Sequence, residues 1–150
     1  GDMAIYYNSL KLIEYIRNIG NFKFVGAEDD GMCLYHALEI CFENSINEKW
    51  YEIKERAIEY YIRNWDYFTD VINIYEDRNT IEKFAEYYEN EWGDDLIVSG
   101  IKNLYDINII IVIWEEASDT IWCQNDIVNE LNTYYLLNRD NIHYDALIKI

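Results

Sequence analysis

Cys33 has the residue type and the position in the chain that a thiol nucleophile requires. It follows an acidic, glycine-marked turn in the stretch DDGMCLYHAL at residues 29–38. A thiol attacks a carbonyl group as the thiolate, and the unpaired N–H groups and dipole of a helix N-terminus stabilise that anion. Because Gly31 has no side chain, the turn can approach a substrate closely and direct backbone N–H groups at a developing oxyanion. The pattern therefore favours a cysteine nucleophile.

A nucleophilic Cys33 needs a histidine partner, because the neighbouring acids oppose thiolate formation. The chain contains only His36 and His143. His36 lies three positions after Cys33 on the expected helix, where its side chain leans back beside the thiol and leaves little room for a substrate. His143 begins the alternating stretch HYDALI, so His143 and Asp145 project from one face of a strand. A carboxylate there holds one imidazole nitrogen and leaves the other for a thiol, as in a catalytic triad.

Each of these features has a second interpretation in which no chemistry occurs. A free cysteine at a helix start is commonly a small buried residue, and a histidine near a carboxylate is commonly a structural pair. A metal site of Cys33, His36 and Cys41 offers only three ligands on one helix, which does not match tetrahedral zinc spacing. We therefore expect no metal and no cofactor. The spacing by itself leaves the catalytic and structural interpretations open.

Hydrophobic periodicity predicts the elements that must position these residues. A first helix is predicted from the apolar spacing between Leu12 and Ile19, with Asn8 or Ser9 as its cap and Gly20 as its stop. Further helices are predicted at residues 33–42, 47–64, 81–88 and 95–104, the last two with Asn79 and Asp94 as caps. Strands are predicted at residues 22–25, 107–113, 120–123, 133–137 and 143–148. The run INIIIVI at 107–113 is typical of a strand buried on both faces, whereas residues 66–78 lose their period and are expected to be irregular. Helices precede most strands, so we predict an α+β fold with a small mixed β-sheet packed between helices.

Composition limits the classes of function. Of the 150 residues, 51% are hydrophobic and 17% aromatic, which predicts one domain at residues 4–150, with residues 1–3 as a tag remnant. The net charge of −17 disfavours binding to nucleic acid or membrane surfaces. It either attracts a basic protein partner or is simply a solvated acidic surface that keeps the protein soluble. No hydrophobic run approaches the ~18 residues of a membrane span. Three cysteines form an odd set, so we expect reduced thiols, a cytoplasmic location and a monomer.

Three motifs, in this order, resemble those of the OTU (ovarian tumour) cysteine proteases. DGMCLYHAL at 30–38 resembles that family's cysteine box, and NEWGDDL at 90–96 resembles its Trp-Gly loop, with INIIIVI as the core strand that follows. HYDALI at 143–148 resembles the terminal His-aromatic-Asp/Asn motif. The order and spacing agree over roughly residues 22–150, and the chain is most similar to the viral branch found in nairoviruses.

The resemblance implies a papain-like fold and a cysteine isopeptidase activity. In the viral branch the domain removes ubiquitin, and often the interferon-induced ubiquitin-like modifier, from host proteins. The matching positions make Cys33 the nucleophile, His143 the general base and then acid, and Asp145 the orienting acid. For a viral chain the implied location is the host cytoplasm and the implied role is evasion of host immunity.

The resemblance also implies roles for the turn before Cys33 and for the Trp-Gly loop. Asp30 is expected to order the turn, in which backbone N–H groups from Gly31 through Met32 to the cysteine form an oxyanion hole. Trp92 and Gly93 are expected to border a narrow channel that receives the glycine-ended tail of the modifier.

Two departures from the family pattern keep a second function open. Met32 replaces the usual Asn of the cysteine box, so the turn depends on backbone donors alone. Asp94 stands where cellular members often have a second Gly, which alters access to the tail channel. With the acidic surface, these departures leave as the alternative a catalytically weak or inactive module that binds ubiquitin.

Overall fold

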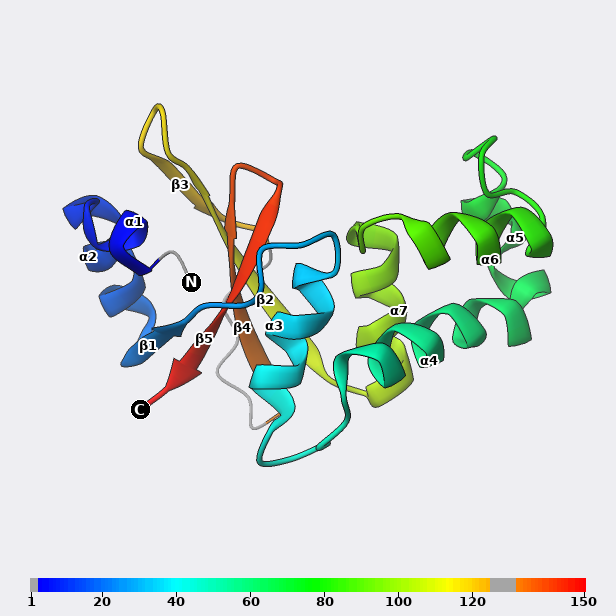
Figure 1. Cartoon of the computed structure of the whole chain (residues 1–150), viewed down its shortest axis with the longest axis horizontal. Helices are drawn as coiled ribbons and strands as arrows, with labels where there is room; N and C mark the ends of the chain where they lie inside the picture. Colours follow the sequence, from blue (N-terminus) through cyan, green and yellow to red (C-terminus); the bar gives the residue numbers. More distant parts are fainter. Residues whose placement is uncertain (1–2, 125–131) are drawn as a thin grey trace.

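The computed structural model describes residues 3–124 and 132–150 and contains one five-stranded sheet (Figure 1). Its strands are β1 (Phe22–Val25), β2 (Asn108–Glu115), β3 (Thr120–Cys123), β4 (Thr133–Arg139) and β5 (His143–Lys149). They lie in the order β1-β5-β4-β2-β3. The β2–β4 pair is parallel and the other three pairs are antiparallel, so the sheet is mixed.

Helices cover both faces of the sheet, which confirms the predicted α+β architecture. They are α1 (Met3–Tyr7), α2 (Leu10–Ile19), α3 (Cys33–Phe42), α4 (Trp50–Arg63), α5 (Trp65–Ile72), α6 (Ile81–Asn90) and α7 (Asp95–Tyr105). The short α1 and α2 lie on one side of the sheet, α3 lies against it, and α4 to α7 form a helical lobe on the other side (Figure 1). None of these helices is long and apolar enough to cross a membrane.

β2 joins the two hydrophobic cores, because six consecutive residues of this strand are buried. Ile109, Ile111 and Ile113 pack into the larger core with α3, α4, α6 and α7. The alternate residues Ile110, Val112 and Trp114 pack into the smaller core with α1 and α2. Successive side chains of a strand point to opposite faces, so one apolar run serves both cores, as predicted for INIIIVI.

The stretch predicted to be irregular, residues 66–78, contains the helix α5, and that prediction was wrong. Trp65, Phe68 and Ile72 are spaced for one face of a helix and pack against the larger core. The opposite face is also apolar, with Tyr67 82% exposed and Val71 49% exposed. Apolar residues on both faces hide the helical period, which depends on contrast between a buried and a solvated face.

The cap of α6 and the start of α4 differ from the predictions by a few residues, whereas the predicted tag remnant stays a prediction. The cap of α6 is Thr80, whose hydroxyl accepts a hydrogen bond from the Lys83 N–H at 3.2 Å, and not Asn79. α4 begins at Trp50, three residues later than predicted. Of the predicted tag remnant, residues 1 and 2 lie outside the described residues, and Met3 begins the unpredicted helix α1.

The helices α4 and α7 approach each other most closely at Gly100. A Cβ atom on Gly100 would lie 2.5 Å from Cε2 and 3.1 Å from Cζ of Tyr61. The Tyr61 ring cannot move away easily, because it is 1% exposed and its hydroxyl donates to the Leu96 carbonyl oxygen. Gly100 therefore lets α7 pack on α4 and deliver the chain into β2.

We predict that Gly100→Ala destabilises the fold by about 1 kcal/mol. Alanine improves helix propensity by about 1 kcal/mol, but overpacking against Tyr61 costs about 1–3 kcal/mol and outweighs that gain. Urea unfolding monitored by circular dichroism measures the difference. Ser99→Ala is the matched control, because Ser99 is the exposed neighbour on the same helix and its replacement should be neutral or slightly stabilising. A Gly100→Ala variant more stable than the wild type would contradict the close packing.

Candidate active site

His143 and Asp145 form a buried hydrogen-bonded pair on β5. Nε2 of His143 lies 2.8 Å from Oδ1 of Asp145, and both side chains are 1% exposed. They share a face of the strand because side chains alternate along it. His143 and Asp145 therefore lie on the same face of β5, as predicted from the alternation in HYDALI.

The same carboxylate oxygen also holds the segment that leads to Cys33. Oδ1 of Asp145 accepts a hydrogen bond from the backbone N–H of Ala27 at 2.6 Å. Ala27 lies two residues beyond Val25, which pairs with Ala146 in the β1–β5 ladder. Asp145 therefore ties the start of the loop 26–32 to the strand that carries the histidine.

Cys33 is the first residue of α3, and its side chain reaches the end of β5. Sγ of Cys33 lies 3.9 Å from the carbonyl oxygen of Ile142, next to His143. The hydrogen bond to Asp145 is the largest influence on His143 and raises its pKa to about 10, with Cys33 adding to the shift and burial opposing it. The structure thus brings the three predicted triad residues together and holds the imidazole in its protonated form at neutral pH.

Asp29 contacts the other imidazole nitrogen, which the sequence did not predict. Its Oδ1 lies 3.2 Å from Nδ1 of His143, although the angle is not that of a hydrogen bond. The Asp29 carboxylate is exposed, with 74% of its side chain accessible to solvent. Nδ1 is the nitrogen that remains for the thiol, since Nε2 is bound to Asp145.

Asp30 organises the turn between this loop and α3. Its Oδ1 accepts from the Met32 N–H at 2.8 Å, and its backbone oxygen accepts from the Cys33 N–H at 3.3 Å. Met32 is the N-cap residue of α3 but provides no side-chain cap, and its side chain packs against the larger core. Two of the N–H groups expected to form the oxyanion hole are thus engaged within the turn, and their role there stays a prediction.

His36 contacts the turn through Asp30 and does not line the pocket in front of Cys33. Its Nε2 lies 3.2 Å from Oδ2 of Asp30, and its ring packs on Trp50 at 4.8 Å. Within residues 3–124 and 132–150, one group of three side chains has ligand atoms close enough for a metal, namely Glu28, Asp30 and His36, within 4.8 Å of one another.

The alternative metal site built on Cys41 is not assembled. Cys41 points to the Tyr135 carbonyl oxygen at 3.6 Å, and burial raises the pKa of its thiol to about 12. Such a thiol stays protonated at neutral pH, whereas a metal ligand must be a thiolate.

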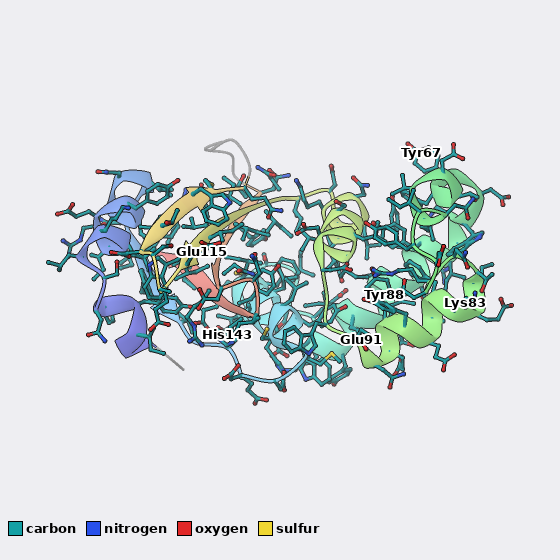
Figure 2. All side chains as sticks on the ribbon, turned by 90° about the horizontal axis from the view of Figure 1, so that it is seen from above. Tyr67, Lys83, Tyr88, Glu91, Glu115 and His143 are labelled. Atoms are coloured by element: carbon teal, nitrogen blue, oxygen red, sulfur yellow. The ribbon has the colours of Figure 1, made fainter. Side chains whose placement is uncertain are left out.

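A pocket of about 560 Å³ opens in front of Cys33. One wall is the turn from Gly31 to Leu34, the second is the loop 91–95, and the third is the β4–β5 connection with Asn138, Asn141, Ile142 and Tyr144. Figure 2 shows Glu91 at the edge of the helical lobe that lies toward His143, while Tyr67 lies at its far end. The predicted channel residues Trp92 and Gly93 both line this pocket.

Two glycines set how closely the walls of the pocket approach. A Cβ atom on Gly31 would lie 2.7 Å from Nε1 of Trp92, so the indole rests directly on the turn backbone. A Cβ atom on Gly93 would lie 2.5 Å from Cδ2 of Leu34. Leu34 is 1% exposed and belongs to the larger core, so its displacement would disturb core packing. A side chain at Gly31 would therefore displace the Trp92 indole, and one at Gly93 would displace Leu34, so the close approach of the Trp-Gly loop to the cysteine turn depends on both glycines.

Asp94 anchors the Trp-Gly loop to the helical lobe. Oδ2 of Asp94 accepts from Nη1 of Arg78 at 2.8 Å, and Oδ1 accepts from the Tyr88 hydroxyl at 2.9 Å and from the Ile97 N–H at 3.2 Å. The Arg78 guanidinium also stacks on Tyr87, 3.8 Å from the ring centroid. The aspartate that departs from the family pattern thus caps α7 and fixes the loop through a buried arginine (Tyr88 is labelled in Figure 2).

Sequence reasoning missed three contributors to this site for different reasons. Ala27 contributes only a backbone N–H, and its contact depends on strand register, which no residue type reveals. Arg78 fell in the stretch expected to be irregular, where a single base between acids was the available signal. Asp29 stood beside Asp30 in the quoted motif, but only the fold shows which of the two faces His143.

Comparison with known proteins finds resemblance at the level of structure. No protein-family model matches the sequence, and no curated protein matches it either. Among solved structures, the viral OTU domain protease from Qalyub virus has 23% identity and a TM-score of 0.66, covering 86% of this chain and 85% of that one. The OTUD1 OTU domain has 19% identity and a TM-score of 0.75, covering 99% and 100%.

A third similar structure is an OTU deubiquitinase from Wolbachia pipientis wMel bound to ubiquitin. It has 15% identity and a TM-score of 0.67, covering 86% of this chain and 96% of that one. Three structures from such distant sources share the arrangement of helices and mixed sheet found here. The chain therefore adopts the fold of the OTU domains.

The raised pKa of His143 predicts a pH-dependent contribution to stability. The folded pKa of about 10 lies above the ordinary value of 6.5, so protonated His143 stabilises the fold fully below pH 6.5. That contribution is lost as the pH rises through about 10. We expect the difference in unfolding free energy between wild type and His143→Gln to be largest near about pH 6 and to shrink toward about pH 10. Urea titrations at both pH values test this, and an unchanged difference would contradict the assignment.

Proposed function

We propose that the protein is a cysteine isopeptidase that removes ubiquitin from other proteins. The observation that carries the proposal is the meeting of Cys33, His143 and Asp145 beside a pocket bordered by the Trp-Gly loop. It is supported by structural neighbours that are OTU proteases, one of them solved with ubiquitin bound. We extend the proposal to ubiquitin-like modifiers as substrates, and to a monomer acting in the cytoplasm, which for a viral chain is that of the host.

The first half of the reaction forms a thioester. The Cys33 thiolate attacks the carbonyl carbon of the modifier's last glycine, so a C–S bond forms and the carbonyl oxygen becomes an oxyanion. The His143 imidazolium then donates its Nδ1 proton to the departing lysine amine as the C–N bond breaks. Asp145 keeps the imidazole oriented through Nε2.

The second half restores the enzyme. Neutral His143 takes a proton from water, and the resulting hydroxide attacks the thioester carbon. A C–O bond forms and the C–S bond breaks, so the modifier leaves as a carboxylic acid that gives its proton to solvent, while Cys33 returns as the thiolate beside the imidazolium. The hydrogen bond to Asp145 raises the pKa of His143 to about 10, so the imidazole is again protonated at neutral pH and ready for the next cycle.

The turn before Cys33 supplies the groups that face the oxyanion. In the resting arrangement the Met32 and Cys33 N–H groups donate to Asp30. To stabilise the oxyanion, both N–H groups would have to turn away from Asp30, the Met32 donor from its carboxylate and the Cys33 donor from its backbone oxygen. Gly31 allows this movement without a side chain that would strike Trp92.

The pocket selects a thin, extended tail. Trp92 and Gly93 leave room for glycine residues beside Cys33, where a bulkier chain would meet the indole. Glu91 and Asp95 line the same pocket, so basic residues in the tail are favoured. A ubiquitin-like modifier with a glycine-ended basic tail satisfies both conditions.

We predict that ubiquitin carrying a C-terminal electrophile labels the protein through Cys33 alone. Cys33→Ala should abolish labelling and lower di-ubiquitin cleavage by at least about 1,000-fold, because no other group can form the thioester. Cys41→Ala is the matched control and should label normally, since the Cys41 thiol is buried and protonated. Mass spectrometry identifies the labelled residue. Labelling of the Cys33→Ala variant would contradict the assignment, and tight ubiquitin binding without any cleavage would favour the binding-module alternative.

We predict that Trp92→Ala weakens substrate binding more than it slows the chemical steps. The half-exposed indole lines the pocket and is not a triad residue, so its loss should raise KM about tenfold and change kcat less than about threefold. Steady-state cleavage of a fluorogenic ubiquitin substrate separates the two constants. Trp122→Ala is the control, because Trp122 is a partly exposed tryptophan on the edge strand β3 and does not line the pocket. A fall in kcat at constant KM would assign Trp92 a different role.

A further inference from the structure

The second oxygen of the Asp145 carboxylate, Oδ2, is buried and has no hydrogen-bond partner of standard geometry among the described residues. Oδ1, in contrast, accepts from both His143 and Ala27. Asp145 is 1% exposed, and a buried charged oxygen without a donor is costly. The position of the carboxylate therefore depends on which group lies against Oδ2.

Tyr6 of α1 lies against this carboxylate. The residue is fully buried, and its ring packs on Trp114 at 5.6 Å and on Phe24 at 5.8 Å. Its hydroxyl, like Oδ2, has no partner of standard geometry within the described residues. Burial raises the pKa of Tyr6, the neighbouring Asp145 carboxylate raises it further, and the Arg139 guanidinium lowers it. The hydroxyl thus keeps its proton and faces the carboxylate as a donor.

The register of β4 and β5 explains why a residue of α1 reaches the triad. Leu137 pairs with Asp145, and Leu137 belongs to the smaller core that also contains Tyr6. Directly paired side chains lie on the same face of a sheet, so Asp145 points toward the layer of α1 and α2. Cys33 approaches from α3, which belongs to the other layer. The triad is thus contacted from both helical layers.

We propose that Tyr6 is a positioning residue of this site, whose hydroxyl donates to Oδ2 of Asp145 and so keeps Oδ1 directed at His143. This inference rests on the proposed function only for the role of His143 as general base and acid, and the contact between Tyr6 and Asp145 does not depend on it. Tyr6 touches neither substrate nor thiol, and it acts through the carboxylate. Of the two charged groups beside the hydroxyl, Asp145 and Arg139, only the carboxylate can accept its proton.

The effect of Tyr6 is expected to appear in the titration of His143. The hydrogen bond to Asp145 is the largest cause of the raised pKa of His143, so a carboxylate free to turn lowers that pKa. The charged or titratable groups that face the imidazole from the surrounding elements are Asp145, Asp29, Cys33 and the cross-strand neighbour Arg139. None of them changes in a Tyr6→Phe variant, which also keeps the ring packing.

The decisive experiment is an NMR titration of the imidazole signals in wild type, Tyr6→Phe and Tyr7→Phe. The chain has two histidines, and a His36→Gln variant assigns the remaining signal to His143. In Tyr6→Phe the pKa of His143 should fall by about half a unit or more, and kcat of ubiquitin cleavage should fall about tenfold. Tyr7→Phe is the matched control, because Tyr7 is half exposed, stacks on the same Phe24 and should leave both values unchanged.

A double-mutant cycle separates positioning from packing. In an Asp145→Asn background, Tyr6→Phe should lose most of its effect on the pKa of His143, because the negatively charged acceptor is gone. An unchanged His143 titration in Tyr6→Phe, or an equal effect in both backgrounds, would overturn the proposal and leave Tyr6 as a packing residue. If the titration shifts as expected but the wild type cleaves no ubiquitin substrate, the coupling of Tyr6 to His143 stands and the proposed function fails.

Discussion

One carboxylate oxygen holds together the two chain segments on which the site depends. Oδ1 of Asp145 accepts from Nε2 of His143 on β5 and from the Ala27 N–H just beyond β1. The antiparallel β1–β5 ladder brings these donors to the same side of the carboxylate, and the loop from Ala27 then runs directly into the turn before Cys33. Asp145 therefore orients the histidine and fixes the approach of the cysteine at the same time. Its loss would leave two buried donors without an acceptor, a larger penalty than the loss of one hydrogen bond.

The substrate side of the site depends on a second charged centre, located in the helical lobe. Arg78 and Tyr88 hold the Asp94 carboxylate, which caps α7 and ends the Trp-Gly loop. α7 in turn leads into β2, the strand that serves both cores. The position of Trp92 over Gly31 is thus set by packing of the lobe and not by the loop alone. A glycine in place of Asp94 would remove both the cap of α7 and one of the acceptors for Arg78.

Features determined by spacing along one element could be predicted from the sequence, whereas contacts between segments far apart in the chain could not. Local periodicity predicted α3 from Cys33 to Phe42 and the strand pair of His143 and Asp145, because spacing along one element determines them. α5 escaped prediction because Tyr67 and Val71 place apolar side chains on its exposed face. The contacts of Ala27 and Tyr6 with Asp145 escaped because they depend on strand register and layer packing. Such contacts join residues more than 110 positions apart, so no local sequence pattern predicts them.

Two carboxylates lie beside the His143 imidazole in this acidic chain, and the burial of Asp145 decides which of them holds the imidazolium. Asp29 and Asp145 lie at similar distances from the two imidazole nitrogens, 3.2 and 2.8 Å. Two unit charges about 4 Å apart interact by about 1 kcal/mol in water and about 4 kcal/mol at an effective dielectric constant of about 20. Asp29 is mostly in solvent and Asp145 is not, so water screens the contact of Asp29 far more strongly. The imidazolium is therefore held by Asp145 through Nε2, and its Nδ1 proton remains available to Cys33 although a second carboxylate lies beside it.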